Sequence, residues 1–146
     1  LIPTPGDKGS RPNLAGHHVL LAEDNMLNRE IAMELLKMTN ITVDCAENGR
    51  EALDKFLTNG GQYDLILMDV QMPVMDGYQT TMAIRKSDHP RALSIPIIAM
   101  TADAFREDVI RASSAGMNGH LAKPIDPSLL FQTLAEVIEN NGTVQR

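Results

Sequence analysis

The stretch Asp64-Leu65-Ile66-Leu67-Met68-Asp69 is the strongest predicted strand of this chain and indicates its fold class. Its four consecutive apolar residues have the length and composition of a β-strand that is buried on both faces. Such strands belong to parallel sheets covered by helices on both sides, because a sheet with one face in water alternates apolar and polar residues. The stretch therefore predicts an α/β protein, with Asp69 at the carboxyl end of one of its strands.

The sequence on both sides of this stretch alternates between apolar runs and helical periodicity. Strands are predicted at about 19–22, 42–46, 64–68, 95–100 and 119–122, and helices at about 26–38, 48–59, 76–86, 105–115 and 127–141. The main apolar stripe of the first helix consists of Leu27, Ile31, Leu35 and Met38. Gly142 is expected to end the last helix. These elements predict a (βα)5 doubly wound fold, a five-stranded parallel sheet in the flavodoxin-like order 2-1-3-4-5 with helices on both faces.

The length of 146 residues suits one domain with a single core. Residues 1–16 are rich in proline and glycine and are predicted to be a flexible linker, so that order begins near His18. Residues 17–140 are expected to form the folded domain and residues 141–146 a C-terminal tail. The chain does not begin with methionine, which suggests a fragment of a longer protein.

Composition argues against several classes of function. Thirteen Lys and Arg residues against nineteen Asp and Glu residues give a net charge of -6, which argues against nucleic-acid binding. No apolar stretch approaches the ~20 residues of a membrane-spanning helix, so we expect no direct membrane contact by this domain. Cys45 is the only cysteine, which excludes an internal disulfide and fits a cytoplasmic location. A longer parent protein could still be anchored in a membrane.

Polar side chains stand at the predicted strand ends. Glu23 and Asp24 follow the first strand, Asp69 the third, Thr101 the fourth and Lys123 the fifth. A single aspartate after a strand commonly caps the next helix, whereas the carboxyl ends of parallel strands share one edge, where open sheets of this kind bind their ligands. We therefore expect these side chains to converge on one site.

The chemistry of this set points to a divalent metal and to phosphoryl transfer. Three neighbouring carboxylates repel one another and need a cation to remain ionised. Mg²⁺, with Mn²⁺ as a substitute, favours such hard oxygen ligands. Asp24, Asp69 and a backbone carbonyl near Gln71 would bind it, with Glu23 acting through water. Asp69 could then attack phosphorus, while Lys123 and the Thr101 hydroxyl bind phosphoryl oxygens.

The segment Leu67-Met68-Asp69-Val70-Gln71-Met72-Pro73-Val74-Met75-Asp76-Gly77 resembles the phosphorylation loop of response-regulator receiver domains in two-component signalling. The family's other motifs are matched in order and spacing by Glu23-Asp24-Asn25, Met100-Thr101-Ala102 and Lys123-Pro124. The resemblance covers about residues 17–140 and is greatest to receivers of hybrid sensor histidine kinases.

The resemblance implies a role for each matching residue. Asp69 would be the phosphorylated aspartate and Lys123 the phosphate-binding lysine, followed by a cis peptide bond to Pro124. Glu23, Asp24 and the backbone carbonyl of Gln71 would hold Mg²⁺. Thr101 would be the switch hydroxyl. His120 stands where the family has Tyr or Phe as an aromatic switch, so it could turn inward when Thr101 moves or have little role in switching.

The resemblance also implies partners and a context. The donor would be a phosphohistidine on a histidine kinase dimerisation domain or a histidine phosphotransfer protein, and apolar residues of the first helix such as Met26 and Met33 could contact it. The domain would be a monomer or weak dimer that loses its phosphate slowly, with Gln71 and Asp103 beside the path of the attacking water. The parent would be a hybrid histidine kinase, with a stand-alone response regulator as the alternative.

Three other functions fit parts of this sequence less well. A small Mg²⁺-dependent phosphatase of the haloacid-dehalogenase type also uses a strand-end aspartate, but its second aspartate would fall at Gln71. A nucleotide- or flavin-binding module would need a glycine-rich loop after the first strand, where this chain has acids. A degenerate receiver that acts only in binding is disfavoured, because all five key residue types are present.

Overall fold

The computed structural model describes residues 11–102 and 106–144. The five parallel strands of the sheet are β1 (His18–Ala22), β2 (Thr42–Ala46), β3 (Leu65–Asp69), β4 (Ile97–Thr101) and β5 (Gly119–Ala122). Their order is β2-β1-β3-β4-β5, which confirms the predicted flavodoxin-like order. Within the described part of the chain, no helix combines the length and the apolar character that crossing a bilayer requires.

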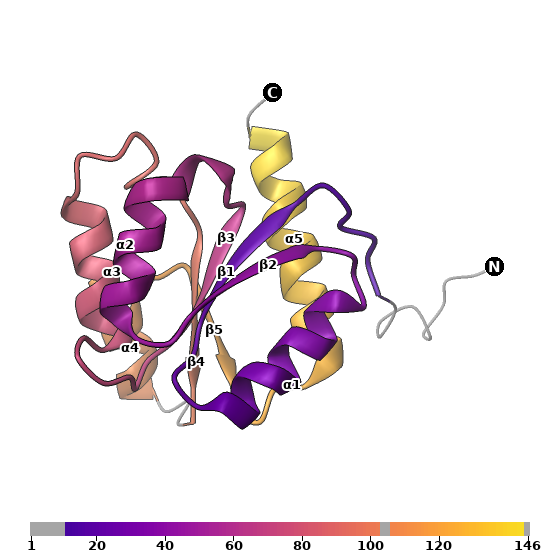
Figure 1. Ribbon diagram of the computed structural model, residues 1–146, viewed down its shortest axis with the longest axis horizontal. Coiled ribbons are helices and arrows are strands. Elements are labelled where there is room, and N and C mark those ends of the chain that lie inside the picture. Colours follow the sequence, from indigo (N-terminus) through magenta and orange to yellow (C-terminus); the bar gives the residue numbers. More distant parts are fainter. Residues whose placement is uncertain (1–10, 103–105, 145–146) are drawn as a thin grey trace.

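Helices cover both faces of the sheet (Figure 1). The helices are α1 (Met26–Lys37), α2 (Gly49–Asn59), α3 (Gly77–Lys86), α4 (Arg106–Ala115) and α5 (Pro127–Val144), with a short 3-10 turn, η2, at Gly60–Gln62. In Figure 1, α1 and α5 lie on the right of the sheet and α2, α3 and α4 on its left. All residues of β3 and β4 are buried, as a strand between two helical layers requires. The core is accordingly split into two clusters, one on each face.

Local sequence signals explain several of the helix ends. The Asn25 side chain caps α1 by accepting from the Asn28 N–H at 2.9 Å, and Asp76 forms a capping box with Gln79 at the start of α3. Gly116 ends α4 with a φ of 108°, in the left-handed region. The prediction that Gly142 ends the last helix is wrong, because α5 continues to Val144. Glycine within a helix costs only about 1 kcal/mol, so it does not by itself terminate one.

The packed structure begins earlier than the predicted start near His18. Leu14 is buried against the core of the α1 and α5 side, and its N–H donates to the Thr39 carbonyl at 2.6 Å. The predicted linker of residues 1–16 therefore includes a part that packs on the domain, whereas residues 1–10 lie outside the described residues.

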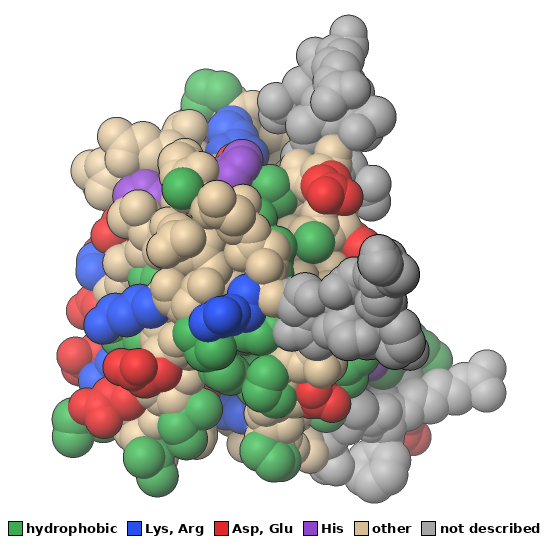
Figure 2. All heavy atoms as spheres, turned by 90° about the vertical axis from the view of Figure 1, so that its right-hand side faces the viewer, with side chains coloured by type: hydrophobic (Ala, Val, Ile, Leu, Met, Phe, Trp, Pro, Cys, Tyr) green, Lys and Arg blue, Asp and Glu red, His purple; other side chains and the backbone are tan. Residues whose placement is uncertain are grey.

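The apolar stripe predicted for α1 is largely exposed. Leu27 and Ile31 expose 65% and 48% of their surface, whereas Ala32 and Leu36 are buried against the sheet. Figure 2, which views the α1 and α5 side, shows hydrophobic side chains gathered along its lower part, the end at which α1 begins in Figure 1. Because apolar side chains left in water this way often mark contact surfaces, α1 is a candidate for partner binding.

Candidate functional site

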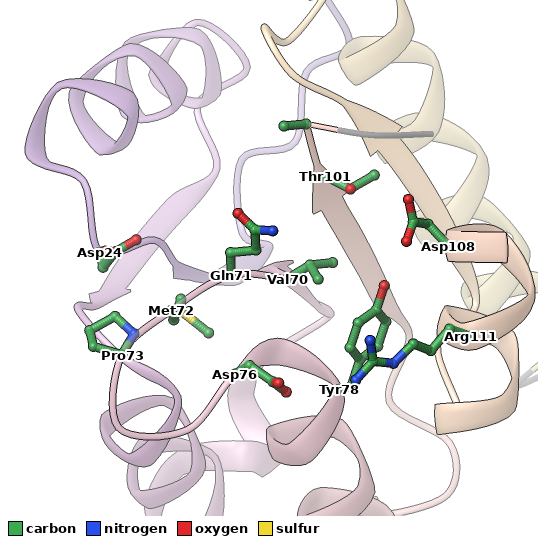
Figure 3. Close-up of a pocket in the computed structure, with 11 residues that line it drawn as sticks. Asp24, Val70, Gln71, Met72, Pro73, Asp76, Tyr78, Thr101, Asp108 and Arg111 are labelled. Atoms are coloured by element: carbon green, nitrogen blue, oxygen red, sulfur yellow. The ribbon is translucent and has the colours of Figure 1, made fainter. Parts of the chain in front are cut away.

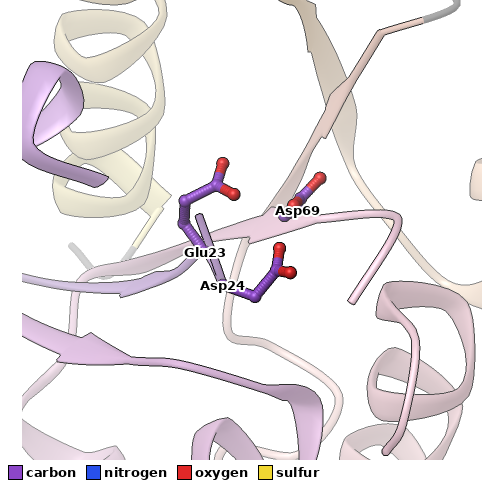
Figure 4. Close-up of side chains that lie close together, drawn as sticks. All are labelled: Glu23, Asp24 and Asp69. Atoms are coloured by element: carbon purple, nitrogen blue, oxygen red, sulfur yellow. The ribbon is translucent and has the colours of Figure 1, made fainter. Parts of the chain in front are cut away.

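Three carboxylates meet at the carboxyl edge of the sheet. Glu23 and Asp24 lie in the connection from β1 to α1, and Asp69 is the last residue of β3. Each offers a carboxylate oxygen, and these oxygens lie within 4.8 Å of one another (Figure 4). Glu23 and Asp69 are only 2% and 3% exposed, whereas Asp24 is exposed. The adjacency of β1 and β3 in the sheet explains why residues 45 positions apart in the sequence form one acidic group.

Lys123 joins this group from the end of β5. Its Nζ lies 3.0 Å from Glu23 Oε1 and 3.1 Å from Asp69 Oδ1. The Lys123–Pro124 peptide bond is cis, as the resemblance implies, and the Lys123 N–H donates to the Thr101 carbonyl at 2.8 Å. Among the described residues, Lys123 is the one cation that forms an ion pair with any of these carboxylates, and it pairs with Glu23 and Asp69. One ammonium group therefore faces three acids.

Burial and this excess of acid together govern the protonation of the site. Burial raises the pKa of Asp69 to about 7, helped by its hydrogen bond with Glu23 and the charge of Glu23, while Lys123 acts in the opposite direction. Burial lowers the pKa of Lys123, but its contacts with Glu23 and Asp69 outweigh burial and raise it overall. A carboxylate group of this kind fits a hard divalent cation, which would supply the missing positive charge.

The loop after β3 is held close to Asp69. The Gln71 N–H donates to Asp69 Oδ1 at 3.3 Å, and the Gly77 N–H donates to the Val70 carbonyl at 2.8 Å. Val74 in this loop has a φ of 71°, which is rare for a β-branched residue, and its side chain is 80% exposed. Gln71 thus lies beside the acids, and the role of its carbonyl as a metal ligand stays a prediction.

A cavity of about 620 Å³ opens beside the acids (Figure 3). Thr101, only 8% exposed, lies on its wall at the end of β4. The wall also contains two residues that sequence reasoning missed, Tyr78 of α3 and Arg111 of α4. The Arg111 guanidinium carbon lies 4.3 Å from the centre of the Tyr78 ring, a cation–π contact. Each residue alone reads as an ordinary helix position, so only the packing of the two helices reveals this wall.

His120 does not lie among the acids. It is exposed on β5 and lines a separate groove with residues of α4, including Val109 and Ser113. Its role as a switch therefore remains a prediction. Asp103, expected beside the path of the attacking water, lies outside the described residues.

The raised pKa of Asp69 predicts how stability depends on pH in the absence of metal. Between about pH 4 and pH 7 the folded protein holds a proton on Asp69 that the unfolded chain has lost, so the free energy of unfolding falls as the pH rises through this window. The expected loss is on the order of 2–4 kcal/mol. Asp69→Asn should remove this dependence and be more stable than the wild type at pH 8 in EDTA. Urea unfolding of both proteins at several pH values measures it, and parallel profiles would contradict the assignment.

The strand order and the acidic edge define a class of doubly wound α/β domains with a carboxylate site at the strand ends. The family model described as the response regulator receiver domain matches residues 19–135, and the chain belongs to this family. It is a receiver domain of two-component signalling, related to the receivers of hybrid histidine kinases.

Named relatives support this assignment. Hybrid signal transduction histidine kinase M of Dictyostelium discoideum is 39% identical over 84% of this chain, and probable histidine kinase 6 of Oryza sativa subsp. japonica is 30% identical over 94% of it. The chain spans only 5% and 16% of those two proteins.

Solved structures agree with the fold. The receiver domain of the sensor histidine kinase PA1611 from Pseudomonas aeruginosa PAO1, solved with a magnesium ion in its active-site cleft, has a TM-score of 0.78 and 36% identity, covering 86% of this chain and 99% of that one. A chain of the complex between the Saccharomyces cerevisiae histidine phosphotransfer protein Ypd1 and the receiver domain of Ssk1 has a TM-score of 0.73 and 30% identity, covering 84% of this chain and 88% of that one.

Proposed function

We propose that this domain accepts a phosphoryl group from a phosphohistidine onto Asp69 in a phosphorelay, with Mg²⁺ bound beside it. The observation that carries the proposal is the buried Asp69 carboxylate between Lys123 and two further acids at the strand ends. In the reaction, an oxygen of Asp69 forms a bond to phosphorus as the bond from phosphorus to the donor nitrogen breaks, and the imidazole leaves with the electron pair.

Each side chain at the edge has a task in this reaction. Asp24 and Asp69 would hold the metal together with the Gln71 carbonyl, and Glu23 would support them from its buried position. The bound Mg²⁺, for which Mn²⁺ could substitute, supplies positive charge for the phosphoryl oxygens. Lys123 is already placed to bind a further oxygen once Asp69 carries the phosphoryl group. The Thr101 hydroxyl would bind another from the end of β4.

The surface next to the acids suits a helical donor. Leu27, Ile31 and Met26 on α1 are exposed, and Leu129 at the start of α5 is 51% exposed. A small, mainly apolar pocket is lined by Ile31 of α1, by Ile125 of the connection from β5 to α5, and by Lys123. Helices that carry a reactive histidine could pack their apolar side chains here and bring that histidine to Asp69. We infer that the donor is a histidine kinase dimerisation domain or a histidine phosphotransfer protein, of the kind that the yeast receiver contacts.

We propose that the parent protein is a hybrid sensor histidine kinase whose receiver domain lies in the cytoplasm, whether or not the parent is anchored in a membrane. A stand-alone response regulator is the alternative. The support is that the relatives are long kinases of which this chain matches a small part.

The test is the intact mass of the protein after incubation with acetyl phosphate. We expect one phosphoryl adduct in the wild type with Mg²⁺, and none in EDTA or in Asp69→Asn. The matched control is Asp54→Asn, which changes an exposed aspartate of α2 away from the site. Steady release of phosphate over many turnovers, instead of stoichiometric labelling, would favour the phosphatase alternative. An adduct that persists in Asp69→Asn would overturn the proposal.

A further inference from the structure

The connection from β1 to α1 carries two of the three carboxylates, Glu23 and Asp24. The side chain of Asp24 is not held in place by other side chains. Among the described residues, the Asp24 carboxylate takes part in no hydrogen bond or ion pair, although it faces Asp69 (Figure 4). Its position is therefore set by the backbone on either side of it. The contacts that fix this backbone therefore determine the position of the Asp24 carboxylate oxygens.

The backbone at Glu23 is fixed at both of its polar groups. The Glu23 N–H donates to the Ala46 carbonyl of β2 at 3.0 Å. The Glu23 carbonyl accepts from Arg29 Nη1 at 2.9 Å, and in the described part of the chain Arg29 is the only side chain that donates to the backbone of Glu23 or Asp24. Arg29 lies within the first turns of α1, so it reaches back over the loop that precedes its own helix.

Arg29 is itself held in place. Its side chain is 15% exposed, and its Nη2 lies 3.8 Å from Glu47 Oε2 in the connection from β2 to α2. The guanidinium thus joins two neighbouring loops at the carboxyl edge of the sheet. A planar group with several donors can contact both at once, whereas the single ammonium of a lysine cannot match this geometry.

From these contacts we propose that Arg29 is a positioning residue of the metal site, which fixes the Glu23 carbonyl and so directs the Asp24 carboxylate toward Asp69. The inference rests on the proposed function, because it assigns Arg29 to the Mg²⁺ site of that function. Outer groups that orient metal ligands typically contribute 10- to 100-fold to metal affinity.

The charge of Arg29 makes the proposal sharply testable. A cation near the site repels Mg²⁺, so if Arg29 acted only through its charge, its removal would tighten Mg²⁺ binding. If Arg29 positions the loop, removal weakens binding despite the relief of repulsion. Arg29→Lys separates the two effects further, because it keeps the charge and loses the planar group.

The experiment is calorimetric titration of Mg²⁺ into wild type, Arg29→Gln and Arg29→Lys, with Arg50→Gln as the control. Arg50 is a 64% exposed arginine of α2 that pairs with Asp54. We expect Mg²⁺ binding about 10-fold weaker in both Arg29 variants and unchanged in the control. The Mg²⁺ concentration that gives half-maximal labelling by acetyl phosphate should rise by a similar factor in both Arg29 variants. The labelling rate at saturating Mg²⁺ should stay close to that of the wild type.

Several outcomes would overturn this role. Tighter binding in Arg29→Gln with unchanged binding in Arg29→Lys would assign a purely electrostatic effect. Unchanged affinity in both, or failure of both to fold in EDTA, would leave Arg29 a general structural residue. The proposed function is tested separately: wild type that binds Mg²⁺ but takes no phosphoryl group contradicts that function alone, and the calorimetric comparison of the Arg29 variants still stands.

Discussion

Replacing Lys123 by methionine is expected to slow labelling by acetyl phosphate by roughly 100-fold or more. The Lys123 ammonium lies 3.1 Å from Asp69 and, among the described residues, is the cation that pairs with the phosphoacceptor. Methionine keeps much of the side chain's length and apolar character but offers no charge and no donor. Phosphoryl transfer depends on such fixed positive groups, because charge spreads over the equatorial oxygens in the transition state.

The same variant should still bind Mg²⁺. Removal of the ammonium leaves Glu23 and Asp69 without their ion-pair partner, which increases the attraction of the site for a divalent cation. The measurements are the rate of adduct formation at saturating Mg²⁺ and the rise in melting temperature on addition of Mg²⁺. Lys86→Met, at an exposed lysine of α3, is the matched control. A Lys123→Met rate within about threefold of the wild type would show that this lysine does not act on the phosphoryl group.

Replacing Gly77 by alanine is expected to lower the free energy of unfolding by about 3 kcal/mol. A Cβ at this position would lie 2.4 Å from the Asp69 carbonyl oxygen and 2.9 Å from Val70 Cα. Both are backbone atoms, so no side chain can rotate to make room. The first residue of α3 must then move away from the end of β3, which breaks the hydrogen bond from the Gly77 N–H to the Val70 carbonyl.

Urea unfolding of Gly77→Ala beside Gly61→Ala measures this cost. An alanine Cβ at Gly61 would have no atom within 4 Å, so that control should stay within about 0.5 kcal/mol of the wild type. We also expect Gly77→Ala to take up phosphate slowly even where it is folded, because the carbonyl that the new Cβ crowds belongs to Asp69. Equal stability of the two variants would mean that the connection from β3 to α3 adapts easily.

Much of the fold follows from the sequence because each strand is short, apolar and bounded by helical signals. The run Leu65-Ile66-Leu67-Met68 requires burial on both faces, and the structure buries it completely. Caps at Asn25 and Asp76 mark where helices start, since a side-chain oxygen must satisfy the first free N–H groups. Because the carboxyl ends of parallel strands share one edge of the sheet, the sequence also predicts that Glu23, Asp69 and Lys123 lie close together, as they do in the structure.

Other features depend on contacts between segments that are distant in the sequence. The face of α1 that turns inward is decided by its fit on the sheet, which selects Ala32 and Leu36 and leaves Leu27 exposed, although both stripes are apolar. The burial of Leu14 depends on a site formed near Thr39, which a proline- and glycine-rich composition does not reveal.

The parallel sheet, the acidic edge and the lysine that completes it can be predicted from the amino-acid sequence, because hydrophobic periodicity and the residues at strand ends are local properties of the chain. By contrast, the contact of Tyr78 with Arg111 and the hydrogen bond from Arg29 to the Glu23 carbonyl emerge only in the folded molecule. Such pairings arise from side-chain directions and helix packing, which no spacing along the chain encodes.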